Sequence, residues 1–193
     1  MGKRADLGMS GAVSRDDSRV KIEQLLSQFY GGPTGFAQLG QFGSVDKAPA
    51  PYDALLDHNK HMTVTVESFH DESVTVDVHR TDRQANWYAR EITLATEQSK
   101  RIVQYGIVRL NVDALNPDVW KRIESQEIPL GRVLIQHNVL REVELCELWE
   151  VRAGESLSNL LRIKNGDTVF GRTALIYCDG EPAIELLEIV APA

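Results

Sequence analysis

One arginine interrupts the apolar face of a predicted strand. In the run WYAREITL, residues 87–94, strand periodicity places Arg90 on the same face as Tyr88, Ile92 and Leu94. A guanidinium keeps its proton inside a protein, so its burial is unfavourable unless an anion satisfies it. The spacing therefore predicts that Arg90 meets an anion, either a buried carboxylate of the protein or a group on a ligand. The sequence leaves both readings open.

A glutamate occupies a similar position near the end of the chain. Glu188 shares a strand face with Leu186, whereas Glu185 shares the other face with Leu187. Apolar surroundings raise the pKa of a carboxyl group toward neutrality, which suits the group to general acid and base chemistry. Periodicity does not separate Glu188 from Glu185, and an ion pair between Arg90 and one of them is the structural alternative.

The run IPLGR, residues 128–132, predicts a helix that begins at Pro129. The backbone amides of Leu130 and Gly131 have no partners within such a helix, and little side-chain bulk lies in front of them. This helix start is suited to holding a carboxylate or a phosphate, although an ordinary well-started helix shows the same pattern.

Three further arginines bear on the charge of the site. Arg132 follows the predicted helix start, and Arg172 lies in the run FGRT; both supply positive charge. Arg109 lies between two apolar residues and is expected on a solvated face. Together, the inward Arg90, the open helix start and an inward glutamate outline a pocket for an anionic small molecule. Such a pocket needs no cofactor and no metal, and its glutamate supplies a proton-transfer group.

Composition limits the class of protein further. The chain has 193 residues, 42% of them hydrophobic and 25% charged, which is typical of one globular domain with its own core. Its formal net charge of -7 argues against a nucleic-acid partner, because such proteins present a basic surface to phosphates. Cys146 and Cys178 lack the spacing of a disulfide framework or a zinc site.

No run reaches the roughly 18 apolar residues of a membrane span. The sequence has no GxSxG, Walker or HExxH motif, and its glycines lack the spacing of a dinucleotide-binding fingerprint. We therefore expect a cytoplasmic protein with a small-molecule partner and with neither nucleic-acid nor membrane partners.

The N-terminal quarter is predicted to be largely irregular. Residues 1–15 are polar and aperiodic and predict a disordered tail, so that residues 16–193 form the single domain. Helical spacing begins at Asp16 and ends before Gly31. Residues 31–52 hold five glycines and three prolines, and predict an irregular segment that is either a fixed connection or a lid. Phe36 and Phe42 are expected to pin it to the core.

The rest of the chain alternates in period between strand and helix. Asn116 is expected to cap one helix, Pro129 to start another, and a third is predicted at residues 156–163. Strands are predicted at residues 62–67, 74–79, 86–94, 104–112, 143–151, 169–178 and 183–190. This is an α+β fold with a mainly antiparallel sheet of six or seven strands and peripheral helices.

Five short runs, in this order, resemble the chorismate lyase family between about Leu55 and Pro192. They are His61–Met62–Thr63, WYAREI at 87–92, IPLGR at 128–132, Gly171 with Arg172, and EIVAP at 188–192. The resemblance implies a chorismate lyase-like fold with six strands. It also implies a cofactor-independent elimination that splits chorismate into 4-hydroxybenzoate and pyruvate.

The resemblance also implies roles for individual residues. Arg90 would bind the ring carboxylate, together with the backbone amides of Met62 and Leu130. Glu188 would meet the oxygen at the para position, and its place relative to Pro192 selects it over Glu185. Arg90 and Glu188 are then the catalytic residues. The substrate-binding residues are Arg90, Met62, Leu130, Gly131, Arg132 and Arg172.

Two alternatives accompany this prediction. Residues 31–52 and 95–104 depart from the pattern of the enzyme of ubiquinone synthesis, so a relative that acts on a different chorismate-derived substrate in secondary metabolism is one alternative. The other is a non-catalytic domain that binds an aromatic carboxylate, because ligand-sensing domains of bacterial transcription regulators share the fold. The inward glutamate opposite an inward arginine favours the enzyme.

Overall fold

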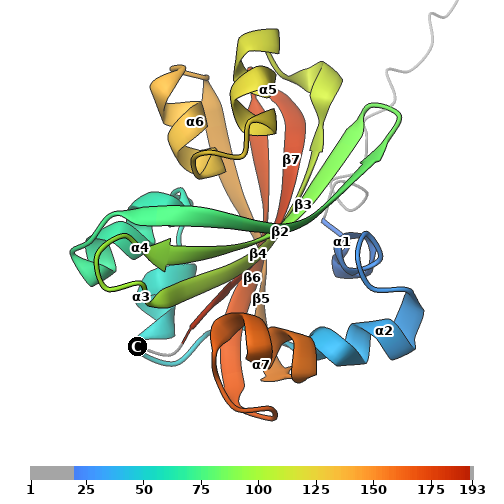
Figure 1. The fold of residues 1–193 in the computed structure, drawn as a ribbon, viewed down its shortest axis with the longest axis vertical. Coiled ribbons are helices and arrows are strands. Elements are labelled where there is room, and N and C mark those ends of the chain that lie inside the picture. The colour runs from blue at the N-terminus through green and yellow to red at the C-terminus, as the bar shows by residue number, and fades with distance from the viewer. Residues whose placement is uncertain (1–19, 192–193) are drawn as a thin grey trace, which may run out of the picture.

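The computed structural model describes residues 20–191 as a seven-stranded antiparallel sheet with helices packed on both faces (Figure 1). In spatial order the strands are β1 (Gly40–Val45), β5 (Arg141–Ala153), β6 (Thr168–Cys178), β7 (Glu181–Val190), β4 (Ile102–Asn111), β3 (Trp87–Thr96) and β2 (Val74–Gln84). The helices are α1 (Ile22–Leu26), α2 (Gly32–Leu39), α3 (Tyr52–Leu56), α4 (Met62–His70), α5 (Pro117–Glu124), α6 (Leu130–Gln136) and α7 (Glu155–Leu161), with a 3-10 turn at Val112–Ala114.

The predicted α+β class with a mainly antiparallel sheet and peripheral helices is confirmed. The predicted tail, the first four residues of the predicted N-terminal helix and Pro192 lie outside the described residues. No helix between residues 20 and 191 is long and apolar enough to cross a membrane.

The two faces of the sheet carry different helices. One face packs against α1, α2 and α7 through a cluster that includes Leu25, Tyr105 and Leu187. The other face is covered by α3 to α6, which form two separate clusters: one joins α5 and α6 to one end of the sheet, and the other joins α3 and α4 to the opposite end (Figure 1). The arrangement leaves room on this second face between the two clusters.

The register sets which side chains share the second face. Arg90 of β3 lies opposite Val108 of β4, which in turn lies opposite Leu186 of β7. Two residues along the same face, Gly106 lies opposite Glu188. Side chains of the central strands therefore converge from neighbouring positions above one area of the sheet.

The strand predicted at residues 62–67 is wrong, because these residues open helix α4. The buried positions are Met62, Thr63 and Val66, a helical spacing, while Val64 is 46% exposed. Six residues are too few to separate the two periods, and packing overrides the strand preference of the β-branched residues. Consequently the polar stretch before β2 connects a helix to a strand and does not form a hairpin.

The irregular segment predicted at residues 31–52 is also wrong. Helix α2 and strand β1 occupy most of it, and β1 pairs along its whole length with the edge of β5. This strand makes the sheet seven-stranded, where the family resemblance implies six. Phe36 and Phe42 do pack against the core, as expected. The N-terminal helix ends at Leu26, before the predicted boundary.

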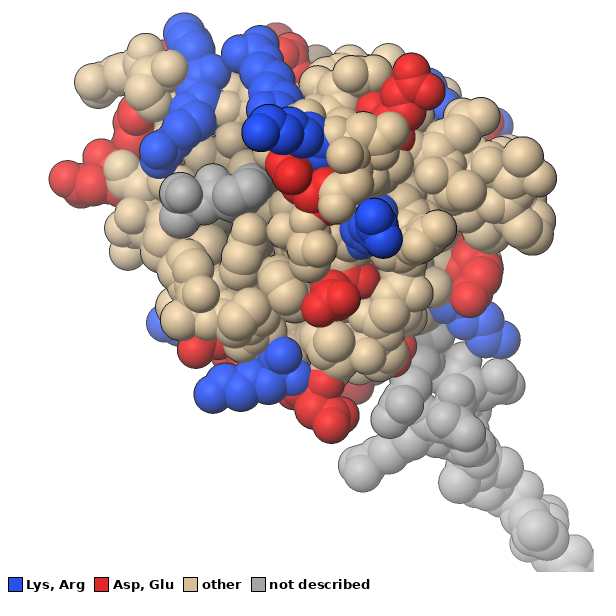
Figure 2. Space-filling model, turned by 90° about the horizontal axis from the view of Figure 1, so that it is seen from below, with Lys and Arg blue, Asp and Glu red and all other residues tan. Residues whose placement is uncertain are grey.

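The helix starts predicted after residue 115 are confirmed. Asn116 caps α5 by accepting a hydrogen bond from the amide of Asp118, with Pro117 in the first helical position. Helix α6 begins directly after Pro129. On the surface seen from below in Figure 2, acidic and basic side chains are interspersed among uncharged ones.

Candidate ligand-binding pocket

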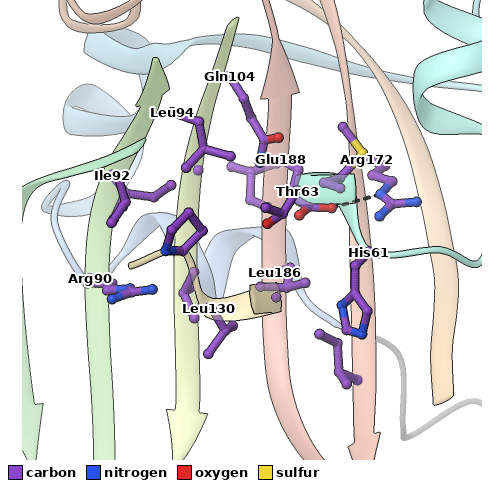
Figure 3. Close-up of a pocket in the computed structure, with 18 of the residues that line it drawn as sticks. His61, Thr63, Arg90, Ile92, Leu94, Gln104, Leu130, Arg172, Leu186 and Glu188 are labelled. Carbon is purple, nitrogen blue, oxygen red and sulfur yellow. Dashed lines mark hydrogen bonds and ion pairs between the residues drawn. The ribbon is translucent and has the colours of Figure 1, made fainter. Parts of the chain in front are cut away.

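A pocket lies on the second face of the sheet, between the two apolar clusters (Figure 3). Its floor comes from β3, β4 and β7, with Ile92, Gly106 and Leu186 among the lining residues. The first residues of α4 and α6, Met62 and Leu130, lie over this floor. Segments distant in the sequence thus surround one small space.

Arg90 enters this pocket without a hydrogen-bond partner in the part of the chain that the structure describes. Its side chain is 1% exposed, and Nε and Nη1 are buried with no hydrogen bond among residues 20–191. Burial lowers the pKa of the guanidinium from its usual value, but an arginine remains charged. The structural alternative, an ion pair between Arg90 and a glutamate, is not formed in the described part of the chain.

The neighbouring residue on β3 shows the contrast. Glu91 points to the opposite face and is 2% exposed, yet it is fully bonded. Its carboxylate accepts hydrogen bonds from Tyr30 at 2.6 Å, Tyr105 at 2.7 Å and two nitrogens of Arg80 at 2.6 and 2.9 Å. Within the described residues, the fold therefore provides partners for the buried charge of Glu91 and no hydrogen-bond partner for that of Arg90.

Glu188 is held by Arg172 at the other side of the pocket (Figure 3). Nε of Arg172 donates to Oε2 of Glu188 at 2.8 Å. The remaining nitrogens of Arg172 donate to backbone carbonyls of the connection between α3 and α4, those of Leu56, His58 and Lys60. Arg172 is completely buried and its nitrogens are engaged by protein groups, so it positions Glu188. Among the described residues no hydrogen bond forms to Oε1 of Glu188.

The competing Glu185 lies on the opposite face from the pocket. It accepts a hydrogen bond at 2.8 Å from Arg109, whose guanidinium also lies over the ring of Trp87. The prediction that Arg109 is on a solvated face is wrong: its side chain is 12% exposed. Arg109 is mostly buried because both a carboxylate and an aromatic ring cover it.

The starts of α4 and α6 meet at the pocket. A Cβ on Gly131 would lie 3.0 Å from Oγ1 of Thr63, so the absence of a side chain allows the two helices to approach closely. Met62 and Leu130 are the first helical residues, and their amides have no acceptor within their own helices. Arg132 lies outside the pocket lining and pairs instead with Glu67 of α4.

Of the predicted site residues, the structure places Arg90, Glu188, Arg172, Met62, Leu130 and Gly131 in the pocket lining, and leaves Arg132 outside it. The pattern of residue types did not single out two further lining residues, His61 and Gln104. Gln104 carried a signal, because it is a polar residue on the same strand face as Gly106 and Val108. His61 carried a signal only through the family resemblance, in which it is the first residue of the run His61–Met62–Thr63.

His61 is a neutral hydrogen-bonding group at the edge of the pocket. Nε of Arg141 donates to its Nε2 at 2.5 Å, which leaves the proton on Nδ1. Burial and the positive charges of Arg141 and Arg172 lower the pKa of His61 to about 4. The imidazole therefore adds no charge to the pocket near neutral pH.

No cluster of three or more histidine, cysteine or acidic side chains that would suit a metal ion occurs within residues 20–191. The charged lining consists of Arg90, Arg172 and Glu188, which sum to one positive charge. Partial positive charge at the two helix starts has the same sign. The pocket is thus electrostatically suited to an anion.

No protein-family profile matches the chain, and no curated protein matches it. Solved structures do resemble it. The effector domain of PhnF from Mycobacterium smegmatis has a TM-score of 0.49 and 10% identity, over 68% of this chain and 88% of that domain. In the longer PhnF structure the match covers 63% of that chain.

Two other similar structures come from regulators. The C-terminal domain of the histidine utilization repressor from Pseudomonas syringae has a TM-score of 0.43 and 14% identity, over 61% of this chain and 91% of that domain. A GntR-family transcriptional regulator from Bacillus cereus has a TM-score of 0.44 and 9% identity, over 62% of this chain and 92% of that chain. At this level of similarity we take no function from these proteins.

Proposed function

We propose that the pocket binds a small aromatic carboxylate, with Arg90 holding the carboxylate group. The observation that carries this proposal is the buried guanidinium of Arg90, which has no hydrogen-bond partner at Nε and Nη1 among the described residues. A carboxylate fits the two-pronged donor geometry of a guanidinium and compensates its charge. The first amides of α6 add donors with the same preference.

The walls suit an apolar, flat body behind that carboxylate. Ile92, Leu94, Val108, Leu130 and Leu186 line the pocket together with Arg90 and Glu188. Oε1 of Glu188 offers an acceptor to a hydroxyl group at the far end of the ligand. A hydroxybenzoate meets all three requirements: an anion at one end, an aromatic ring and a donor at the other end.

Isothermal titration tests this assignment. The unaltered protein should bind 4-hydroxybenzoate and should bind the neutral 4-hydroxybenzamide at least about 100-fold more weakly, since Arg90 would then remain uncompensated. Arg90→Met should remove the preference for the acid. Arg152→Met, the same change at an exposed position of β5, is the matched control and should leave it intact. Equal binding of acid and amide to the unaltered protein would overturn the proposal.

The second candidate function is the elimination of pyruvate from chorismate, and the position of Glu188 favours it. The carboxylate accepts a hydrogen bond from Arg172, lines the same pocket as Arg90 and has no hydrogen bond to Oε1 within the described chain. The motif resemblance to chorismate lyases gives further support. In this reaction one ring carbon loses a proton, and the bond between the neighbouring ring carbon and the oxygen of the enolpyruvyl group breaks. The ring becomes aromatic, and the released enolpyruvate takes up a proton and ketonises to pyruvate. Glu188 would accept the proton.

Incubation with chorismate, followed by a coupled pyruvate assay and chromatography of the aromatic product, distinguishes the two candidates. Equal amounts of pyruvate and 4-hydroxybenzoate, lost in Glu188→Gln, would support the lyase. Binding of 4-hydroxybenzoate without turnover of chorismate would support the binding function and exclude the lyase reaction.

A further inference from the structure

Gln104 places a carboxamide at the end of the pocket remote from Arg90 (Figure 3). The residue is 3% exposed, and its Oε1 is buried without a hydrogen-bond partner among residues 20–191. Together with the unpartnered nitrogens of Arg90, it gives this one pocket two ends with unsatisfied polar groups. A buried polar group without a partner is unfavourable, and native proteins rarely keep one without cause.

The strand register orders the polar groups along the pocket. Arg90 lies level with Val108, Glu188 lies level with Gly106, and Gln104 follows on the same face of β4. Each step of two residues advances about 7 Å along the strand. Gln104 lies on the strand next to Arg90, and Glu188 lies one strand further away and one step nearer along the strands, so both acceptors face the end of a ligand whose carboxylate meets Arg90.

The residues around Gln104 are apolar, so a carboxamide at this position is unexpected unless it has a partner. Leu94 lies opposite it on β3 and Val190 lies opposite it on β7, and both are buried. A leucine at position 104 would fit this environment with no unsatisfied atom. Among the described residues the fold gives no reason for the amide, so its partner is sought in a ligand.

We propose that Gln104 is a specificity-determining residue that selects aromatic carboxylates with a second hydroxyl group beside the one that meets Glu188. This inference rests on the proposed binding function and narrows its ligand class to vicinal dihydroxybenzoates. A ring hydroxyl donates to Oε1 of Gln104, while its neighbour donates to Glu188. A ligand with one hydroxyl group satisfies only one of the two acceptors.

Titration of two probes, 4-hydroxybenzoate and 3,4-dihydroxybenzoate, tests the inference. The unaltered protein should bind the dihydroxy acid about tenfold more tightly, because only this acid satisfies the buried amide oxygen. Gln104→Leu should abolish the difference while retaining affinity for 4-hydroxybenzoate. Gln41→Leu, at an exposed position of edge strand β1, is the matched control and should keep the preference.

The thermal midpoint of the ligand-free variant gives a second readout. Gln104→Leu should raise it, since the unsatisfied amide is removed, and Gln104→Met offers the same comparison with an unbranched side chain. Equal affinity of the unaltered protein for both acids, or a preference that survives Gln104→Leu, would overturn the inference and leave the proposed function standing. A lower midpoint in both variants would also overturn it. If neither acid binds at all, the proposed function itself fails.

Discussion

Replacing Arg90 by methionine should make the ligand-free protein more stable while it removes the affinity for carboxylates. The guanidinium is 1% exposed, and two of its nitrogens lack partners within the described chain. An unsatisfied buried polar group costs about 1–3 kcal/mol, and more when it is charged. Methionine keeps most of the buried stem and removes the polar atoms. We therefore expect the free energy of unfolding to rise by about 2 kcal/mol, or the midpoint by roughly 6 °C.

Chemical and thermal unfolding, each with and without 4-hydroxybenzoate, provide the assay. A ligand at 100 times its dissociation constant stabilises the unaltered protein by about 2.7 kcal/mol and should leave Arg90→Met unchanged. The variant is thus the more stable protein without ligand, and it loses this advantage when ligand is added.

Arg80→Met is the informative control, because it removes a partnered arginine. It leaves the buried carboxylate of Glu91 with only its two tyrosine donors, so it should destabilise the protein by about 3 kcal/mol. Opposite signs for the two substitutions are the expected result. A loss of stability above about 1 kcal/mol in Arg90→Met would refute the reasoning, since it would mean that the fold itself satisfies this guanidinium.

Three further outcomes can be measured. Arg172→Met leaves the carboxylate of Glu188 without its partner and should lower the free energy of unfolding by about 3 kcal/mol in a denaturant titration. Gly131→Ala pushes against Thr63 and should weaken 4-hydroxybenzoate binding about tenfold in calorimetry, with recovery when Thr63→Ala is added to remove the obstructing hydroxyl. The folded-state pKa of His61, about 4, lies below its ordinary 6.5, so protonation favours the unfolded chain and stability falls as the pH drops from 6.5 toward 4. Between pH 7 and pH 5, the free energy of unfolding of His61→Gln should fall by about 1 kcal/mol less than that of the unaltered protein in denaturant titrations, allowing for the partial exposure of the ring. An equal fall in the two proteins would contradict the lowered pKa of His61.

Strand periodicity found Arg90 and limited the inward carboxylate to Glu188 or Glu185, and the family resemblance then selected Glu188. Arg90 and Glu188 each break an apolar face in a run long enough for the period of two to be clear, and both faces prove to be the same face of the sheet. The helix start at Pro129 was equally visible, because proline and its position carry the signal locally.

Partner choice could not be read from the sequence, because it depends on the order of the strands. Glu188 pairs with Arg172 because β6 lies beside β7, and Glu185 pairs with Arg109 because β4 lies on the other side. Local patterning gives neither neighbour. Without the strand order, Arg90 was an equally good partner for both glutamates.

The start of α4 shows a second kind of limit. Residues 62–67 alternate as a strand would, but their buried positions follow the helix that packs against α6. The resemblance nevertheless assigned a binding role to the amide of Met62, and the structure places this amide at a helix start beside the pocket. Tertiary packing decided that residues 62–67 form a helix and not a strand. The amide of Met62 lies beside the pocket because Met62 is the first residue of that helix.

The two adjacent charges on β3 predict how related sequences should vary. Glu91 belongs to a closed set with Tyr30, Tyr105 and Arg80, so substitutions in any of these four residues should be accompanied by changes in the others. Arg90, one position away, makes no hydrogen bond within the described chain, and its replacement requires no compensation elsewhere. The two faces of β3 are therefore constrained separately. The face that carries Glu91 and its partners can stay unchanged while the residue at position 90 changes with the ligand.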